Sequence, residues 1–166
     1  MKIQKDFSLQ NLKNQNKMKI LNHKERKEIQ DKLTEQFGIK KIPNVLVKFG
    51  EEKIFAFSGN LTLLQKLQKL TRIEGIGSYI AKEQRDEIRL SIEGSHLFKS
   101  QITKNIFELN AEQKNLWMHG SELNIQTNKR GFLVMKYNDD FLGTGKASEH
   151  KIGNFIPKIR RLKERN

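Results

Sequence analysis

The sequence predicts an α+β protein in which a small α/β unit precedes a mixed β-barrel with short helices. Apolar residues recur at helical spacing in the first half, and strand-like alternation takes over after residue 72. A glycine-containing hairpin near the C-terminus gives the clearest pair of strands. The chain has 166 residues, of which 36% are hydrophobic and spread along its length, so it can form a folded core.

Residues 1–19 are rich in Lys, Asn and Gln and form no apolar pattern. We expect a frayed tail, as is common at chain ends. A basic arm that becomes ordered on RNA has the same composition, so both interpretations stand. The segment lacks the apolar core of a signal peptide, and no apolar run in the chain approaches the roughly 20 residues that span a bilayer.

Residues 20–71 are predicted to form the N-terminal unit, which starts with a helix. Asn22 and Glu25 make a capping box, in which the Asn side chain accepts from a helix amide and the Glu side chain reaches back. Gly38 ends the helix, because glycine tolerates the left-handed conformation found there. The apolar face of this helix consists of Ile29, Leu33 and Phe37.

Two short strands follow, at 45–49 and 53–57, and a second helix is expected at 61–70. Residues 58–60 end the second strand and offer side chains that cap this helix. The leucines expected to face inward are Leu63, Leu64, Leu67 and Leu70. We place the boundary between the two units at 71–72, where the helical pattern gives way to alternation.

Residues 72–166 are predicted to form the barrel, in which short strands alternate with short helices. Asn110 and Gln113 make a second capping box. The helix that they open carries Trp117, which we expect in the core, with base stacking as the alternative. Pro157 confines the last segment to a sheet edge or marks its end. The expected strands and extended segments are 73–82, 88–90, 104–109, 123–125, the hairpin 131–147, and 152–161.

The hairpin is the most informative stretch of the chain. Two apolar, β-prone runs flank a polar Asn-Asp-Asp turn at 138–140. Gly143 and Gly145 lie in its second strand, where glycine usually marks a close approach by another backbone or a ligand. Protein packing and an RNA backbone both fit this pattern. We expect this strand to lie beside the segment 154–161.

Nucleotide and metal motifs are incomplete. Gly143–Lys146 resembles the end of a phosphate-binding loop, but Asp140 and Ala147 stand where that loop needs Gly and Ser or Thr. The pair Gly75 and Gly77 lacks the third glycine of a dinucleotide site. The four histidines lack metal-ligand spacing, and the chain has no cysteine for disulfides, thiolate metal sites or catalysis. We therefore expect no cofactor and no metal. The absence of cysteine is also compatible with a reducing compartment.

The formal net charge of +13 favours a polyanionic partner, because neutralised phosphates release counterions. A merely basic soluble protein and a lysine-rich protein at a membrane surface are also compatible with this charge. Cations on an extended C-terminal edge suit phosphate contacts, since alternate residues there point to one side; a solvated terminus is the alternative. The predicted RNA contacts are Lys136, Lys146, Lys151, Lys158, Arg160, Arg161, Lys163 and Arg165.

The stretch from about Gly75 to Arg161 resembles the PUA domain, an RNA-binding β-barrel module. The motifs that carry this resemblance, in the expected order, are Arg89–Ser95, Trp117 with Gly120, Gly131–Val134, Leu142–Lys146 and Asn154–Arg161. They are most similar to the PUA-like domain of the Sun/Fmu-type RNA cytosine-5 methyltransferases. The two-unit plan resembles the small pre-PUA plus PUA ribosome-biogenesis factors of the Nip family. The N-terminal unit has no comparably specific motif.

The resemblance implies a non-catalytic RNA-binding protein with rRNA or tRNA as its partner, acting in ribosome biogenesis or as an accessory factor of RNA modification. Catalysis is not implied, because the related methyltransferases use cysteines and an adenosylmethionine-binding domain for which this chain has no room. The alternative is an adaptor that recruits an RNA methyltransferase or an assembly factor, with RNA contact secondary. We expect a monomer in the cytoplasm without membrane contact.

Overall fold

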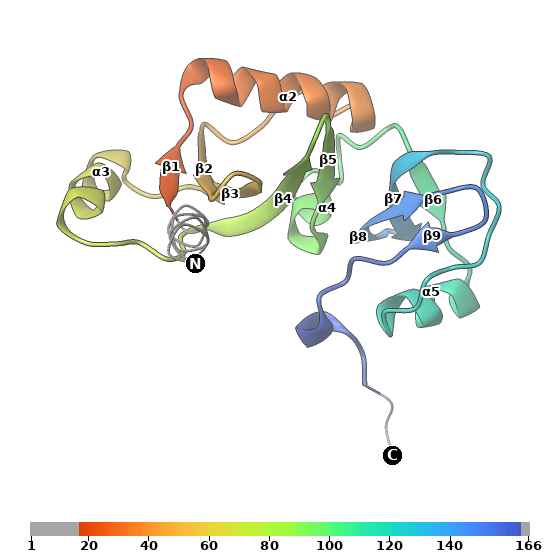
Figure 1. Ribbon diagram of the computed structural model, residues 1–166. Coiled ribbons are helices and arrows are strands. Elements are labelled where there is room, and N and C mark those ends of the chain that lie inside the picture. Colours follow the sequence, from red (N-terminus) through yellow and green to blue (C-terminus); the bar gives the residue numbers. More distant parts are fainter. Residues whose placement is uncertain (1–16, 164–166) are drawn as a thin grey trace, which may run out of the picture.

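The computed structural model describes residues 17–163, so most of the predicted N-terminal tail and Arg165 lie outside the described residues. The chain forms two β-sheets that lie side by side, with helices on their faces (Figure 1). The α+β prediction is confirmed to the extent that the chain mixes helices with β-sheets, one of them a curled half barrel. Among the described residues, no helix is both long and apolar enough to cross a membrane.

The first sheet is antiparallel and has the order β1-β2-β3-β4-β5. Its strands are β1 (Met18–Ile20), β2 (Val45–Phe49), β3 (Lys53–Phe57), β4 (Ser78–Gln84) and β5 (Glu87–Leu90). Helix α2 (His23–Phe37) covers one face, and its predicted capping box and its end at Gly38 are confirmed. Successive side chains of a strand face opposite sides, so Leu46 of β2 packs with α2 whereas Val47 packs with helix α3 (Leu61–Leu70).

Strands β4 and β5 belong to this first sheet, although the sequence analysis assigned them to the C-terminal unit. Strand β3 pairs with β4, with Ile54 opposite Ala81. The sheet therefore continues across the expected boundary at 71–72. Local periodicity does not encode which strands pair across an intervening helix, so the change of pattern did not reveal this. The expected strand 73–82 begins only at Ser78, because Gly77 first turns the chain with a φ of 72°.

One hydrophobic cluster joins the two sheets. It contains Leu33 and Phe37 from α2 and Phe132 and Val134 from the second sheet. These four side chains are at most 2% exposed. The N-terminal helix and the barrel thus share a core, and the division of the chain into separate domains stays a prediction.

Helix α3 departs from the sequence prediction. Asn60 caps it as predicted, since its side chain accepts from the Leu63 amide at 2.9 Å. Leu64 is buried, whereas Leu63, Leu67 and Leu70 are 55%, 41% and 81% exposed. The prediction of four inward leucines is therefore wrong for three of them, because only the Leu64 side of the helix packs on the sheet.

The second sheet curls into a half barrel and has the order β6-β7-β8-β9 (Figure 1). Its strands are β6 (Ile106–Glu108), β7 (Gly131–Tyr137), β8 (Asp140–Ala147) and β9 (Ile152–Gly153). Strands β6 and β7 run parallel, and the other pairs are antiparallel. Helices α4 (Ile92–Leu97) and α5 (Ala111–Met118) pack against this sheet, and the capping box of Asn110 and Gln113 is confirmed.

Two extended segments are shorter than predicted. In the segment 123–125, Leu123 forms an isolated bridge to Ile152 and no strand develops. The segment 152–161 is a strand only at β9 and then forms the 3-10 helix η1 (Lys158–Arg160) after Pro157. Proline fixes φ at a value that suits the first residue of a helical turn as well as an extended edge, so the sequence did not distinguish the two.

Candidate nucleic-acid interface

Strand β8 carries two glycines because other parts of the protein lie against it. A Cβ atom at Gly145 would lie 2.7 Å from Cη2 of Trp117. Trp117 is fully buried, and its Nε1 donates a hydrogen bond to the Leu142 carbonyl at 3.0 Å. Gly143 has a φ of 77°, and its amide donates to Ser95 Oγ at 3.1 Å. Of the two interpretations that the sequence left open, packing is the one observed, and Trp117 is a core residue as predicted.

The neighbour of β8 is β9 rather than the expected segment 154–161. Lys146 lies opposite Gly153, and Ala147 lies opposite Ile152. The chain then leaves the sheet at Asn154. Because they do not pair with β8, the residues after Asn154 can fold over the junction between the two sheets.

Asn154 fixes how the chain continues. Its Nδ2 donates to the carbonyl groups of Trp117 and Ser121 at 2.8 and 3.0 Å. Its Oδ1 accepts from the Ile156 amide at 2.8 Å, which forms a tight local turn. Ile156 is consequently buried, and Phe155 faces outward with 37% of its surface exposed. An exposed aromatic side chain held by a rigid turn is suited to stacking on a ligand.

Two aromatic rings flanked by two cations lie at the junction between the two sheets. Cζ of Arg89 lies 4.6 Å from the centroid of the Phe155 ring. The rings of Phe155 and Phe132 have centroids 5.9 Å apart and are inclined by 59°. Nζ of Lys146 lies 4.9 Å from the Phe132 centroid. We call Arg89, Phe155, Phe132 and Lys146 the junction row. Phe132 is buried beneath it, so Phe155 is the ring that can stack on a base, and Arg89 and Lys146 can contact phosphates.

A pocket of about 60 Å³ adjoins the junction row. The residues that line it include Arg89, Arg160, Tyr79 and Phe155. Glu93 also lines it and pairs with Arg160, with Nη2 and Oε1 2.7 Å apart. Hydrogen-bond donors and apolar faces therefore meet at the place where β5, β8 and the C-terminal segment come together.

Several predicted RNA contacts are already paired with carboxylates. These pairs are Lys136 with Glu108 at 2.8 Å, Lys146 with Glu87 at 2.8 Å, Lys151 with Glu122 at 2.6 Å, and Arg160 with Glu93 at 2.7 Å. Exposed ion pairs contribute at most about 1 kcal/mol each, so a phosphate group can replace the carboxylate. Arg89 differs from them, because it forms no ion pair with any residue in the range 17–163.

The remaining predicted contacts lie in or after η1. Lys158 and Lys163 are exposed. Arg161 is half-buried, and its Nε donates to the Ile156 carbonyl at 3.0 Å. It also packs against Gly120, where a Cβ atom would lie 2.3 Å from that Nε. Arg161 therefore anchors the C-terminal segment. The structure brings Lys146 and Arg160 to the junction, and the role of all eight residues in RNA binding stays a prediction.

Sequence reasoning missed Arg89 and Phe155 as site residues. A usable signal existed for Arg89, because the apolar residues Ile88 and Leu90 on either side of it direct its side chain away from the core. The signal for Phe155 was weaker. Its exposure depends on the Asn154 turn, whose partners Trp117 and Ser121 are distant in sequence.

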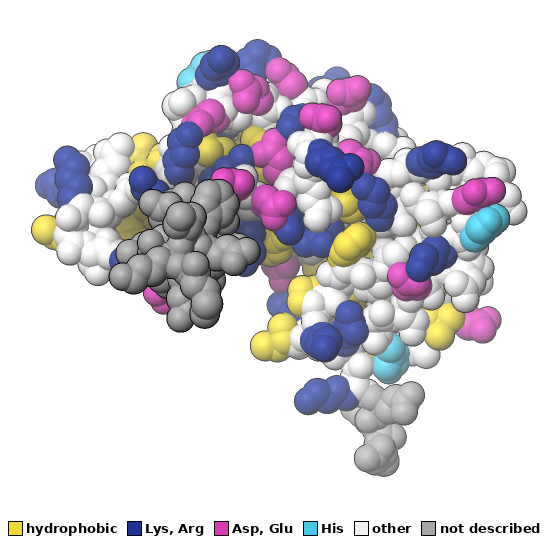
Figure 2. All heavy atoms as spheres, in the orientation of Figure 1, with side chains coloured by type: hydrophobic (Ala, Val, Ile, Leu, Met, Phe, Trp, Pro, Cys, Tyr) yellow, Lys and Arg dark blue, Asp and Glu magenta, His cyan; other side chains and the backbone are white. Residues whose placement is uncertain are grey.

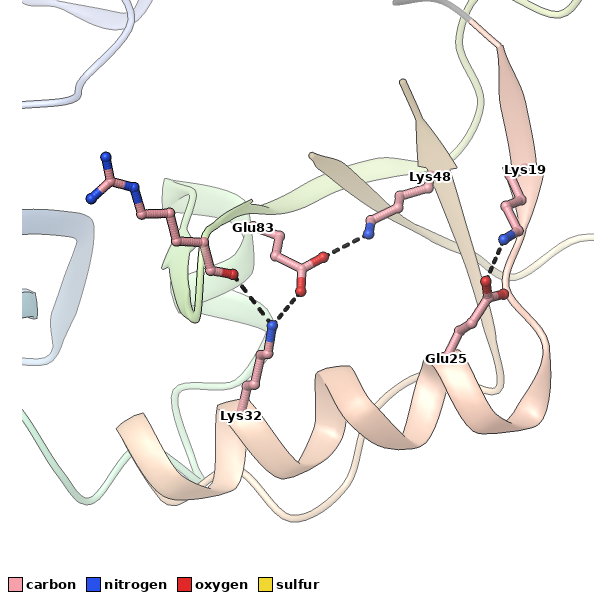
Figure 3. A network of polar contacts seen from close by, with 6 residues as sticks. Lys19, Glu25, Lys32, Lys48 and Glu83 are labelled. Atoms are coloured by element: carbon pink, nitrogen blue, oxygen red, sulfur yellow. Dashed lines mark hydrogen bonds and ion pairs between the residues drawn. The ribbon is translucent and has the colours of Figure 1, made fainter. Parts of the chain in front are cut away.

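A separate charge network ties α2 to the first sheet (Figure 3). Glu83 of β4 accepts hydrogen bonds from Lys32 at 2.5 Å and from Lys48 at 2.6 Å. Burial acts to raise the pKa of Glu83, but the two lysines outweigh it and hold that pKa below the ordinary value of 4.5. Glu25 pairs with Lys19 in the same region, and the hydrogen bond from Lys19 lowers the pKa of Glu25. Both carboxylates serve as structural countercharges.

Positive charge is not collected into one uniform patch on the visible face. Figure 2 shows Lys and Arg side chains interspersed with Asp and Glu over both sheets. Within the described part of the chain, no three His, Asp or Glu side chains are grouped so that they could hold a metal ion.

Comparison with protein families bears on the second sheet. The family model for the PUA domain of the methyltransferase RsmF matches residues 104–162. This range includes β6 to β9, α5 and η1. Residues 104–162 are therefore similar to a PUA domain, which supports the PUA resemblance for this part of the chain. A PUA domain suggests RNA binding. The resemblance predicted from the motifs is confirmed here, whereas the pre-PUA assignment of the N-terminal unit stays a prediction. A search of curated proteins found no match to the chain.

Proposed function

We propose that this protein binds rRNA or tRNA at the junction row and acts without catalysis, in ribosome biogenesis or as an accessory factor of RNA modification. The observation that carries the proposal is the exposed ring of Phe155 stacked under the guanidinium group of Arg89. An aromatic face beside a cation that has no carboxylate partner among the described residues suits a base next to its phosphate.

The neighbouring cations extend this surface. Arg160 lines the adjoining pocket, and Lys158 precedes it in η1. The carboxylate partners of Arg160 and Lys146 lie on the protein surface, so an incoming phosphate competes with them at low cost. Binding should consequently weaken as salt rises, since each phosphate contact releases counterions.

The non-catalytic part of the proposal is supported by composition. The cytosine-5 methyltransferases that the motifs resemble use cysteines, and this chain contains none. Incubation with adenosylmethionine and candidate RNA, followed by mass spectrometry of the nucleosides, tests this point. The expected result is unmodified RNA, and a methylated nucleoside that depends on the protein would refute it.

Fluorescence anisotropy with labelled tRNA and rRNA fragments tests the RNA surface. Phe155→Ala and Arg89→Ala should each weaken binding about tenfold, the size expected for one lost stacking contact. Lys158→Glu combined with Lys163→Glu tests the C-terminal cations that the sequence predicts. Lys24→Ala, at an exposed position of α2, is the matched control.

The outcomes separate the two surfaces. Weaker binding by Phe155→Ala and Arg89→Ala, with Lys24→Ala unchanged, supports the junction row. Unchanged affinity in both junction variants, with circular dichroism showing an intact fold, overturns it. If only the Lys158 and Lys163 double variant loses affinity, the C-terminal segment is the binding surface instead.

A further inference from the structure

Helix α3 leaves an apolar stripe uncovered at one end of the molecule. Leu63, Leu67 and Leu70 are 55%, 41% and 81% exposed. Figure 1 shows α3 at the end of the first sheet farthest from the second sheet, and Figure 2 shows hydrophobic side chains next to Lys or Arg side chains at that end. Exposed leucines in one row are uncommon on a monomer surface and mark contact sites.

The three leucines form a single stripe because of their spacing. At about 100° per residue, positions 63, 67 and 70 fall within a sector of roughly 60°. Leu64 lies about 90° round the helix from the centre of the stripe, Gln68 lies further round, and both attach the helix to the sheet. Leu64 is 1% exposed in the core, and Gln68 Nε2 donates to the Met18 carbonyl at 2.9 Å. The stripe is thus held outward by a helix that is fixed in place.

The spacing and the charge of α3 together indicate what covers the stripe. Leucines at i, i+4 and i+7 match the pattern by which one helix packs along another. Helix α3 contains Lys66 and Lys69 and no acidic residue. A second copy of this helix would bring like charges together, which opposes self-association. A partner with acidic residues beside its apolar face complements both features.

We propose that the outer face of α3 docks an amphipathic helix of another protein, with apolar residues at i, i+4 and i+7 flanked by Asp or Glu. The leucine stripe receives the apolar face, and Lys66 and Lys69 contact the flanking carboxylates. This surface is separate from the junction row, so the inference does not depend on RNA binding.

A display library of helical peptides tests the chemistry of this site. The library is selected on the full-length protein, and peptides that also bind a Leu63→Ser, Leu70→Ser variant are removed. Enriched sequences should carry apolar residues at the stated spacing with acidic neighbours. A synthetic enriched peptide should then bind at least about tenfold more weakly to the serine variant. A Lys66→Glu, Lys69→Glu variant should prefer a version of the peptide with Lys in place of Glu.

Several results would overturn the proposal. They are enrichment of peptides without acidic residues, equal binding of the peptide by the wild type and the serine variant, a concentration-dependent dimer that the serine substitutions abolish, and binding to anionic lipid vesicles that they abolish. Anisotropy with RNA accompanies each variant. RNA affinity should stay unchanged, so a failure of this proposal is distinguishable from a failure of the proposed RNA surface.

Discussion

The two helices on the first sheet differ in how much of their apolar surface is covered. Helix α2 buries Ile29, Leu33 and Phe37 to 3%, 0% and 0% exposure. Helix α3 also has apolar residues at helical spacing, yet only Leu64 is buried. The difference arises because the cluster around α2 also receives Phe132 and other residues of the second sheet, whereas the cluster around α3 contains residues of the first sheet and its connections only.

This difference shows that periodicity states which face of a helix is apolar but does not state how many neighbours that face will meet. A helix at the junction of two sheets has partners on more than one side. A helix at the outer end of a sheet has one partner, and a wider apolar surface than that partner can cover stays exposed. The first arrangement yields a core, and the second yields a surface for association.

The largest difference in stability is expected between substitutions of one leucine in α2 and one leucine in α3. Leu33→Ala should lower the free energy of unfolding by about 3 kcal/mol, because it leaves a cavity in a fully packed site. Leu70→Ala, the matched control on α3, should change it by less than about 0.5 kcal/mol, since Leu70 is 81% exposed. Urea denaturation followed by circular dichroism measures both. A similar loss of stability in the two variants would contradict the difference in burial between α2 and α3.

A second contrast concerns two glycines. Gly145→Ala should cost about 1–3 kcal/mol, because the added methyl group would lie 2.7 Å from the buried Trp117 ring. Gly75→Ala is the control, since no atom lies within 4 Å of a Cβ there and its φ is not in the left-handed region. We expect that variant to be unchanged or slightly stabilised. Thermal unfolding of both variants checks this, and a tolerated Gly145→Ala would mean that β8 does not press against α5 as described.

Removing a carboxylate from the charge network that joins α2 to the first sheet should have a third, smaller effect on stability. Glu83→Gln should destabilise the protein by about 1–2 kcal/mol at neutral pH, because Lys32 and Lys48 lose their shared carboxylate. The folded-state pKa of Glu83 lies below 4.5, so its contribution is present above about pH 4.5 and is lost as the pH falls through the folded pKa. The wild type and the variant should therefore converge in stability in acid.

Glu74→Gln is the matched control for this experiment. Glu74 is largely exposed, and its nearest contact with Arg72 measures 3.9 Å. Its substitution should leave both the stability at neutral pH and the acid dependence unchanged. If Glu83→Gln shows the same acid dependence as the wild type, the network of Figure 3 does not govern acid unfolding.

Local signals in the sequence predicted the elements well and their partners poorly. The two capping boxes, the end of α2 at Gly38 and the hairpin around Asn138 depend on neighbouring residues, and the structure has them all. The pairing of β3 with β4 depends on contacts between residues far apart in the chain. For the same reason the sequence did not reveal that three leucines of α3 stay exposed.

The candidate site was predicted in the same uneven way. The sequence directed attention to cations, and the structure places two of them, Lys146 and Arg160, at the junction. The prediction of an extended C-terminal edge was wrong, because η1 forms there and Arg161 turns inward to the Ile156 carbonyl. Arg89 and Phe155 come from segments far apart in the chain and meet only when the two sheets pack together. A site assembled at such a junction is not encoded in either segment alone.

The smallest predicted effect concerns how α3 is held. Gln68→Ala removes the hydrogen bond to the Met18 carbonyl and should cost about 0.5–1.5 kcal/mol. Gln65→Ala, also on α3 and exposed, is the control. Hydrogen exchange should show faster exchange of the α3 amides in Gln68→Ala, with α2 unaffected, because α3 has fewer buried attachments. Exchange that accelerates equally in both helices would mean that α2 and α3 unfold together, and the contrast between a core helix and a docking helix would not hold.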